Sequence, residues 1–226
     1  AYTDETVGGH SITIEDLSFK YDIYSPRDIL SGISLSIPNE KVTAIVGASG
    51  SGKTTLVKLL LGFYEPVDGS IRIGSADLNG YNLGWWRSQC GAVMQEGYLF
   101  SDTIARNIAI SDDEPDIERI RHAARVANIA DYIEALPLAY NTMIGQDGQG
   151  VSQGQRQRIL IARVVYKNPM FVFLDEATNA LDANNERAIT ENLSDFYKGK
   201  TVVVVAHRLS TVRDADQIVV LEEGRI

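Results

Sequence analysis

Cysteine is almost absent from this sequence, which has one, Cys90, in 226 residues. A lone cysteine cannot form an internal disulfide, and it is more typical of a small buried side chain than of a reactive thiol. The three histidines are scattered, and no two histidines or cysteines have the spacing of metal ligands. The sequence therefore disfavours a disulfide-stabilised protein and a structural zinc site.

Long apolar runs and an excess of basic residues are also missing. No stretch approaches the ~18 consecutive apolar residues that a membrane-spanning helix needs, and no signal-peptide pattern begins the chain. The 21 lysines and arginines are outnumbered by 30 aspartates and glutamates, which gives a net charge of −9. Proteins that bind nucleic acid usually show the opposite sign or a basic stripe, so we expect no nucleic-acid partner.

Two kinds of strand pattern are present instead. Residues 12–15 and 33–37 alternate between apolar and polar, which is typical of half-exposed antiparallel strands, and 69–74 reads as a further short outer strand. Continuous apolar runs are typical of parallel strands that are covered on both faces. Four such runs occur, at residues 42–46, 171–174, 202–205 and 218–221.

Helical spacing of apolar residues accounts for much of the remaining chain. We expect helices that start at the glycine-rich segment before residue 56, near Pro115, at about residue 153 and after Asp182. In this interpretation 98–167 is mostly helical, contains no convincing strand and interrupts the alternation of strands and helices. The pattern predicts an α/β fold with a mostly parallel sheet core, an antiparallel β subdomain and an inserted α-helical subdomain.

The expected domain boundaries follow from the same pattern. Residues 1–10 read as a linker, and 11–226 as one domain, for which a hydrophobic content of 44% supplies a sufficient core. Within this domain we assign 11–97 and 168–226 to the core and β subdomain, and 98–167 to the helical subdomain.

The segment at 47–54 reads Gly-Ala-Ser-Gly-Ser-Gly-Lys-Thr and fits the phosphate-loop pattern G-x-x-x-x-G-K-[ST]. It follows an apolar strand and opens a helix, which is the context that the pattern needs. Lys53 would neutralise the β- and γ-phosphates, and the Thr54 hydroxyl would bind Mg²⁺. This predicts the core of a P-loop NTPase. The expected nucleotide-binding residues are Gly47, Ser49, Gly50, Ser51, Gly52, Lys53, Thr54 and Thr55.

Two carboxylates end the apolar strand at 171–174. Asp175 comes at the carboxyl end of a parallel strand, where ligands bind in such sheets, and it can hold Mg²⁺ through water. Glu176 is then placed to orient or deprotonate an attacking water. A solvated acidic turn is the alternative, but the strand and the phosphate loop together favour the catalytic interpretation.

The octet at 151–158, Val-Ser-Gln-Gly-Gln-Arg-Gln-Arg, supplies a second start of a helix that suits an anion. Its Ser-x-Gly-Gln turn offers a hydroxyl, backbone N–H groups and the positive end of a helix. The phosphate loop already provides for one phosphate group, so this second anion-binding start needs a phosphate from elsewhere.

Taken together, these motifs resemble the nucleotide-binding domains of ABC transporters, over nearly the whole chain from about residue 12. The octet resembles the family's Leu-Ser-Gly-Gly-Gln signature, with Val151 and Gln153 as departures. The resemblance implies that the octet faces the nucleotide of a second copy of the domain. Ser152, Gly154 and Gln155 would then contact the ATP held by the phosphate loop of that copy.

The resemblance assigns roles to four further residues. Tyr21 resembles the aromatic residue that stacks on adenine, although Tyr24 is a rival. Gln95 resembles the glutamine that reaches Mg²⁺ and the attacking water, and His207 resembles the histidine that bonds the γ-phosphate and helps to position the catalytic glutamate. Asp182 belongs to a loop that crosses the dimer, and a role as helix N-cap is compatible with that.

Two further segments of the sequence resemble exporters in particular. The segments 98–104 and 145–150 resemble parts of fused exporters that lie near the transmembrane coupling helices, and peptide and bacteriocin exporters or type 1 secretion transporters are the most similar. The resemblance implies an ATPase that requires ATP and Mg²⁺, and that forms a head-to-tail homodimer around two ATP. The implied partners are transmembrane domains outside this chain, at the cytoplasmic face of the plasma (inner) membrane.

Two alternatives come from other functional classes. A soluble ABC-type ATPase of DNA repair or translation would carry a long coiled-coil insertion or a second ATPase half, and neither is present here. A domain that binds ATP only as a regulatory module would be expected to lack Glu176 or His207, and both are present. The sequence therefore favours the exporter ATPase.

Overall fold

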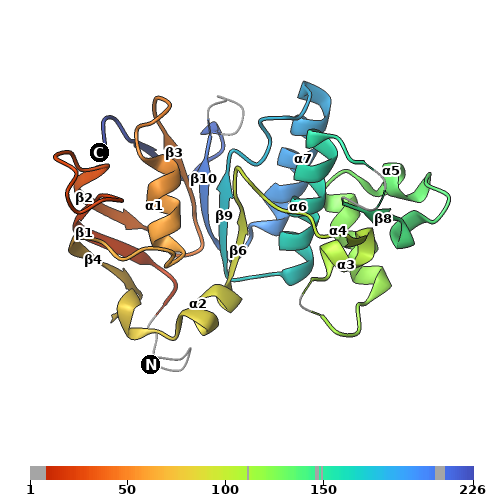
Figure 1. The fold of residues 1–226 in the computed structure, drawn as a ribbon, viewed down its shortest axis with the longest axis horizontal. Helices are drawn as coiled ribbons and strands as arrows, with labels where there is room; N and C mark the ends of the chain where they lie inside the picture. Colours follow the sequence, from red (N-terminus) through yellow and green to blue (C-terminus); the bar gives the residue numbers. More distant parts are fainter. Residues whose placement is uncertain (1–8, 111, 146–147, 149, 207–211) are drawn as a thin grey trace. The chain divides into compact units, whose positions relative to one another are not determined.

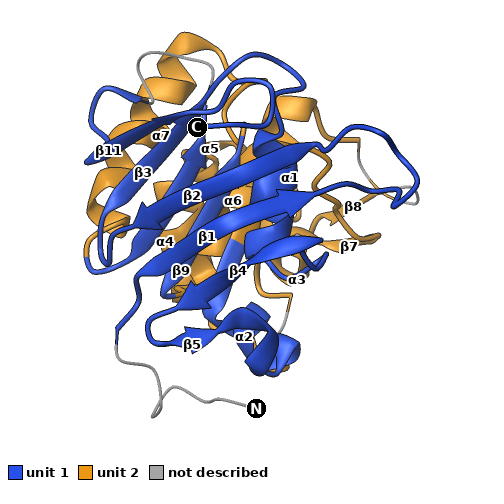
Figure 2. Ribbon diagram, turned by 90° about the vertical axis from the view of Figure 1, so that its left-hand side faces the viewer, with its two compact units in different colours: residues 1–91, 170–175, 199–226 blue, residues 92–169, 176–198 orange. Residues whose placement is uncertain are grey.

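The computed structural model describes residues 9–110, 112–145, 148, 150–206 and 212–226. Contacts within the chain divide it into two compact units, coloured separately in Figure 2. Unit 1 takes its described residues from 1–91, 170–175 and 199–226. Unit 2 takes them from 92–169 and 176–198, so one of the boundaries falls between Asp175 and Glu176.

Unit 1 contains an antiparallel sheet in the strand order β2-β1-β4-β5 (Figure 2). The strands are β1 (Ile12–Phe19), β2 (Leu30–Ile37), β4 (Asp68–Ile73) and β5 (Ala76–Asp77). Ile12 pairs with Ile37 on one side and with Ile73 on the other. The expected antiparallel strands are confirmed, although β1 is longer than the four residues that alternate in the sequence.

An irregularity in β1 explains why its second half escaped prediction. The pairing register shifts after Ile14, and Asp16 has a positive φ of 44°. An extra residue in a strand reverses which positions face the core. Ile14 and Leu17 are therefore both buried, although their spacing of three residues does not fit a regular strand.

The second sheet has five strands in the order β11-β3-β10-β9-β6. The strands are β3 (Val42–Val46), β6 (Cys90–Val93), β9 (Phe171–Asp175), β10 (Thr201–Val205) and β11 (Gln217–Val220). The pairs β3–β10, β9–β10 and β3–β11 are parallel, and every residue of β9 and β10 is buried. The four continuous apolar runs thus form the predicted parallel strands.

Among the described residues, unit 1 also has two helices, which Figure 1 labels, and a short 3₁₀ turn. They are α1 (Lys53–Leu60), α2 (Leu83–Gln89) and η2 (Leu78–Gly80). Trp86 of α2 is fully buried, and its indole N–H donates to the Leu60 carbonyl at 2.9 Å. The edge of its ring meets Phe171 of β9 at 4.8 Å between centroids. This tryptophan therefore contacts α2, the end of α1 and the parallel sheet at once.

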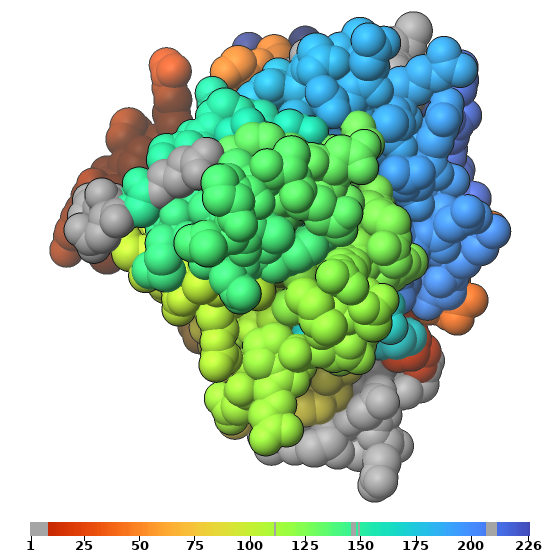
Figure 3. Space-filling model, turned by 90° about the vertical axis from the view of Figure 1, so that its right-hand side faces the viewer, coloured from red at the N-terminus to blue at the C-terminus, as the bar shows by residue number. Residues whose placement is uncertain are grey.

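Unit 2 is predominantly helical, and Figure 3 shows one of its faces in green and blue. Its helices are α3 (Ile104–Ile108), α4 (Ile117–Val126), α5 (Ala130–Glu134), η3 (Ala139–Asn141), α6 (Gln153–Lys167) and α7 (Ala183–Phe196). Helix α6 packs against α3 and α4, and α7 also contacts α4. The expected helices near Pro115, from residue 153 and after Asp182 are confirmed.

The expectation that 98–167 contains no strand is wrong in one detail. The strands β7 (Asp102–Thr103) and β8 (Met143–Ile144) form a short antiparallel pair, in which Asp102 lies opposite Ile144. Two residues are too few to produce an alternating pattern, so the sequence carries no signal for such a pair. Among the described residues, no helix is both long enough and apolar enough to cross a membrane.

Candidate functional site

The phosphate loop of unit 1 joins the end of β3 to the start of α1, and its backbone geometry requires glycine. A Cβ atom on Gly47 would lie 2.0 Å from the Leu221 carbonyl oxygen. Gly52 has φ 104° and ends the loop as the N-cap of α1, which no side chain caps. The first N–H groups of α1 are therefore available to an anion.

Lys53 places its ammonium group inside this loop. The side chain is buried, and Nζ donates to the carbonyl oxygens of Gly47 at 2.9 Å and Ala48 at 2.8 Å, and to Ser51 Oγ at 3.4 Å. The ammonium group is thus held by carbonyl oxygens of the loop itself. Ser49 and Gly50 are exposed at the rim of the loop.

Tyr21 is tied to the helix that follows the loop. Its hydroxyl shares a hydrogen bond of 3.0 Å with Thr55 Oγ1, and its ring meets Phe19 and Tyr64 edge-on at 5.0 and 5.2 Å. Tyr21 is 52% exposed as a residue, which is compatible with a base stacking on its ring. Tyr24 is 87% exposed, so the better-supported ring is that of Tyr21.

Asp175 lies at the same sheet edge as the phosphate loop. It is the last residue of β9, its register partner on β10 is Val205, and β10 also pairs with β3, which leads into the loop. The Asp175 side chain is 0% exposed. Mg²⁺ prefers oxygen ligands such as carboxylate and hydroxyl groups. The Asp175 carboxylate and the Thr54 hydroxyl are therefore groups of the chemical type that suits a magnesium ion.

Glu176 begins the second segment of unit 2, where the structure brings it to Gln95. The Gln95 amide Nε2 donates to Glu176 Oε2 at 3.0 Å, and Asn179 Nδ2 donates to the same oxygen at 3.3 Å. Two predicted residues that lie far apart in the sequence are thus in direct contact. Asn179 was not predicted as a site residue, and Gln157, which contacts the same turn, was missed as well.

The octet starts α6 with a complete capping box. Ser152 Oγ accepts from the Gln155 N–H at 3.1 Å, and Gln155 Oε1 accepts from the Ser152 N–H at 2.8 Å. A hydroxyl that accepts this bond keeps its own hydrogen for an outside acceptor such as phosphate. A Cβ atom on Gly154 would lie 3.2 Å from the Ala180 carbonyl oxygen, so a larger residue would crowd the neighbouring turn.

Asp182 is the N-cap of α7, the structural role that the sequence allowed for it. Its carboxylate accepts from the backbone N–H groups of Asn184 and Asn185, both at 3.0 Å. The hydrogen bond from Asn185 lowers the pKa of Asp182 below its ordinary value, so the side chain is anionic. The predicted residue His207 lies outside the described residues.

Unit 2 also carries an open groove of about 450 Å³ beside Gln95. The residues that line it come from the segment after β6 and from the start of α6: Met94, Gln95, Glu96, Gly97, Tyr98, Val151, Gln153, Arg156, Gln157 and Leu160. Tyr98, one of these lining residues, meets Phe100 edge-on at 5.2 Å, and both side chains are exposed. The groove thus joins the predicted glutamine segment to the octet.

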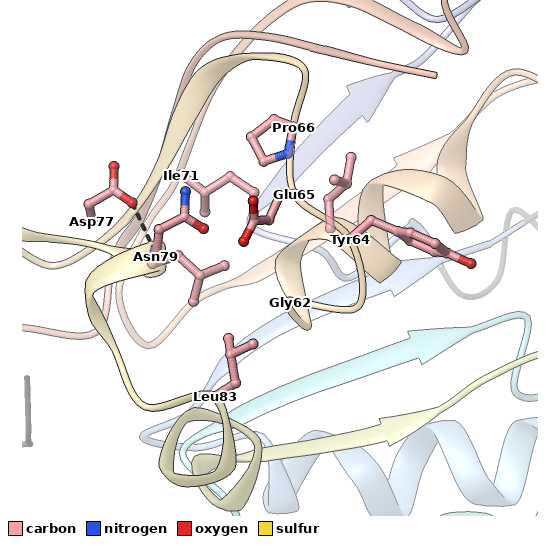
Figure 4. A pocket seen from close by; sticks show the side chains of 10 residues that line it. Gly62, Tyr64, Glu65, Pro66, Ile71, Asp77, Asn79 and Leu83 are labelled. Atoms are coloured by element: carbon pink, nitrogen blue, oxygen red, sulfur yellow. Dashed lines mark hydrogen bonds between the residues drawn. The ribbon is translucent and has the colours of Figure 1, made fainter. Parts of the chain in front are cut away.

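A separate cavity of unit 1 has a different character (Figure 4). It is small, about 50 Å³, and lies between the end of α1 and η2, with Leu59, Ile71 and Leu83 among its apolar walls. Asp77 Oδ1 accepts from the Asn79 N–H at 2.9 Å and so closes the turn beside it. None of the predicted site residues lines this cavity.

Comparison with known families decides among these interpretations. The model of the family described as ABC transporter matches residues 30–179. This chain belongs to the ABC transporter family. As an ABC protein, it is an ATPase domain, and the predicted P-loop fold with a parallel sheet, an antiparallel sheet and helices is confirmed.

Curated ABC proteins of bacteria and plants are similar over 215 residues, or 95% of this chain. The exotoxin translocation ATP-binding protein PaxB of Pasteurella aerogenes is 45% identical, and the alpha-hemolysin translocation ATP-binding protein HlyB of Escherichia coli is 44% identical. ABC transporter B family member 21 of Arabidopsis thaliana is also 44% identical. The chain spans 30% of the length of each bacterial protein and 17% of the plant protein.

A solved structure of a bacterial Atm1-family ABC exporter with ATP bound has the same fold. It superposes with a TM-score of 0.91 at 40% identity, over 97% of this chain and 38% of the exporter chain. The predicted resemblance to ATPase domains of exporters is confirmed, and it is favoured over a soluble repair or translation ATPase and over a regulatory module. The roles of the individual site residues stay predictions.

Proposed function

We propose that this chain is the ATP-hydrolysing part of an ABC exporter of peptides or proteins. Two copies bind two ATP molecules head to tail, and membrane-spanning domains outside this chain carry the substrate. The observation that carries the proposal is the contact between Glu176 and Gln95, because it joins a carboxylate that can accept a proton to an amide that can orient it.

ATP binding is assigned to unit 1. The free N–H groups at the start of α1 and the Lys53 ammonium hold the β- and γ-phosphates, and Tyr21 stacks on adenine. Two observations support this division of roles: Gly52 is an uncapped helix start, and Thr55 ties Tyr21 to that same helix.

Mg²⁺ is assigned to Thr54, to Asp175 through water, and to Gln95. The place of Asp175 at the carboxyl end of a parallel strand, where ligands bind in such sheets, supports this assignment. When bound, the ion neutralises the charge that develops on the phosphate oxygens. The chain contributes the oxygen ligands, and Lys53 supplies a second positive charge beside them.

Glu176 is assigned as the general base. It accepts a proton from water as the water oxygen attacks the γ-phosphorus and the bond to the ADP oxygen breaks. The amides of Gln95 and Asn179 both donate to Oε2, and these two bonds fix the direction in which the carboxylate points. His207 is proposed to bond the γ-phosphate.

The second copy completes each site. Its Ser152 hydroxyl, the N–H of Gly154, the Gln155 amide and Asp182 are proposed to meet the nucleotide on the phosphate loop of the first copy. The capping box supports this role, because it leaves the Ser152 hydrogen and the positive end of α6 for an anion.

The exporter role comes from the relatives. PaxB and HlyB are named as translocation proteins for an exotoxin and a hemolysin, which supports a peptide or protein substrate here. Because cellular ATP is in the cytoplasm, the domain is proposed to act at the cytoplasmic face of the plasma (inner) membrane.

Replacing Glu176 with glutamine tests the base. We expect ATP binding to persist, steady-state hydrolysis to fall by ~10²- to 10⁴-fold, and an ATP-bound dimer to accumulate in size exclusion. Glu191→Gln on α7 is the matched control, since Glu191 is exposed and its carboxylate pairs with Arg187 on the same helix. An undiminished rate in Glu176→Gln would refute the assignment.

The composite site is tested by mixing variants. Ser152→Ala should impair hydrolysis more than ATP binding, and Lys53→Ala should impair binding. In a mixture, one of the two sites of a mixed dimer pairs an intact phosphate loop with an intact octet, so activity should partly return. If neither defect depends on the genotype of the partner, the head-to-tail arrangement is wrong.

A further inference from the structure

The backbone at Glu176 is in an unusual conformation for its residue type. Its φ of 52° lies in the left-handed region, which a residue with a side chain rarely adopts. Such a conformation persists only where its surroundings hold it in place. The turn that begins at Glu176 therefore needs contacts that hold its backbone in this conformation.

Gln157 supplies such contacts from helix α6. Its Nε2 donates to the Glu176 carbonyl oxygen at 3.3 Å and to Asn179 Oδ1, and its Oε1 accepts from the Ala180 N–H at 3.1 Å. The side chain is 7% exposed, so both ends of the amide are used within the protein. One side chain thus binds the turn at three places.

Asn179 carries the same network to the reacting carboxylate. Its Oδ1 accepts from Gln157, and its Nδ2 donates to Glu176 Oε2 at 3.3 Å. Its backbone N–H donates to the Glu176 carbonyl oxygen at 3.2 Å. The order Gln157–Asn179–Glu176 is therefore a continuous chain of hydrogen bonds from α6 to the carboxylate.

We infer that Gln157 and Asn179 are positioning residues for Glu176, and that they tie its carboxylate to helix α6. Gln157 lies one turn after Gly154 on the helix that Ser152 caps. The inference rests on the proposed function, in which α6 meets the ATP of the partner copy while Glu176 acts on the ATP of its own copy. Through Gln157, the position of the octet sets the position of the base.

The test compares ATP hydrolysis by Gln157→Leu and Asn179→Asp with that of the unmodified chain. Leucine nearly keeps the volume of glutamine and removes all three bonds, while the aspartate in Asn179→Asp would face Glu176 with an oxygen in place of a donor. We expect kcat to fall at least tenfold in each variant, with KM and the Kd for ATP within twofold. Gln89→Leu, a half-buried glutamine of α2 whose amide donates to Ser88, is the matched control and should keep its kcat.

A second measurement separates positioning from a general structural defect. In the Glu176→Gln background, adding Gln157→Leu should leave the residual rate unchanged within twofold, because the base it positions is gone. A further tenfold loss there, or a normal kcat in both single variants, overturns the inference. Asn179 is exposed, so Asn179→Asp remains informative if Gln157→Leu unfolds.

The outcomes also distinguish this inference from the proposed function. If Glu176→Gln abolishes hydrolysis while Gln157→Leu and Asn179→Asp do not impair it, the base assignment stands and the positioning role fails alone. If Glu176→Gln hydrolyses ATP at the normal rate, both fail together.

Discussion

Replacement of Asn107 by leucine should destabilise unit 2 strongly, because this one side chain makes several hydrogen bonds to the backbone of residues 100–103. Asn107 lies on α3 and is 1% exposed. Its Oδ1 accepts from the Phe100 N–H at 2.8 Å, and its Nδ2 donates to the carbonyl oxygens of Phe100 at 3.0 Å and Thr103 at 3.1 Å. Arg163 donates to the Asn107 backbone oxygen at 2.8 Å and to Oδ1 at 3.3 Å.

The magnitude follows from the three shortest side-chain bonds. Each hydrogen bond contributes about 1 kcal/mol net, and leucine is close enough in volume to add little cavity cost. We therefore expect a loss of about 3 kcal/mol in the free energy of unfolding, or roughly 150-fold in the equilibrium constant. A typical domain has only about 5–15 kcal/mol in total, so the effect is readily measured.

Urea denaturation with amide hydrogen exchange is the assay. The Phe100 N–H should exchange much faster in Asn107→Leu, since its acceptor is gone. Asn192→Leu is the control, because Asn192 is exposed and donates to carbonyl oxygens at the end of α4, at 3.1 and 3.4 Å. A loss below about 1 kcal/mol in Asn107→Leu, with unchanged exchange at Phe100, would show that the reasoning is wrong.

Three further predictions concern binding and stability. Tyr21→Ala should weaken ATP binding by about 1–3 kcal/mol, whereas Tyr24→Ala should leave the Kd unchanged; fluorescence titration with an ATP analogue decides between them. Ser152→Asp should keep the melting temperature, since aspartate also caps helices, but should lose composite-site hydrolysis because its charge repels phosphate. The N–H of Val42 donates to Asp216 at 2.8 Å and holds the pKa of Asp216 below its ordinary value. The stability that this bond contributes is therefore present above the ordinary pKa of aspartate and is lost as pH falls through the lowered pKa. In Asp216→Asn, the urea concentration at the midpoint of unfolding should therefore fall less steeply as the pH is lowered.

The parts of the site that sequence alone could predict are those whose chemistry is local. The phosphate loop at 47–54 needs its glycines for backbone reasons, so its residues predict its conformation. The same holds for the capping box of Ser152 and Gln155, and for Asp182 as an N-cap, because each bonds within three residues along the chain. In these places the spacing of residue types along the chain determines the local conformation.

The contacts that escaped prediction are those in which partners are brought together by packing. Gln157 reads as one polar residue among several in α6, and only the fold reveals that its amide meets Glu176 and Ala180. Likewise, nothing in the sequence around Asn107 distinguishes it from an exposed asparagine. The bulge in β1 and the pair β7–β8 were missed because neither has enough residues in regular alternation.

The parallel sheet has a consequence for how the nascent chain acquires its nucleotide site. The phosphate loop follows β3, yet the sheet neighbours of β3 are β10 and β11: Val42 pairs with Val202, and Val46 pairs with Val220. The complete loop sequence therefore leaves the ribosome long before the strands that anchor it, and pairings of such long range form slowly. We therefore expect ATP to stabilise the nascent protein only after β10 and β11 have been synthesised and have paired with β3.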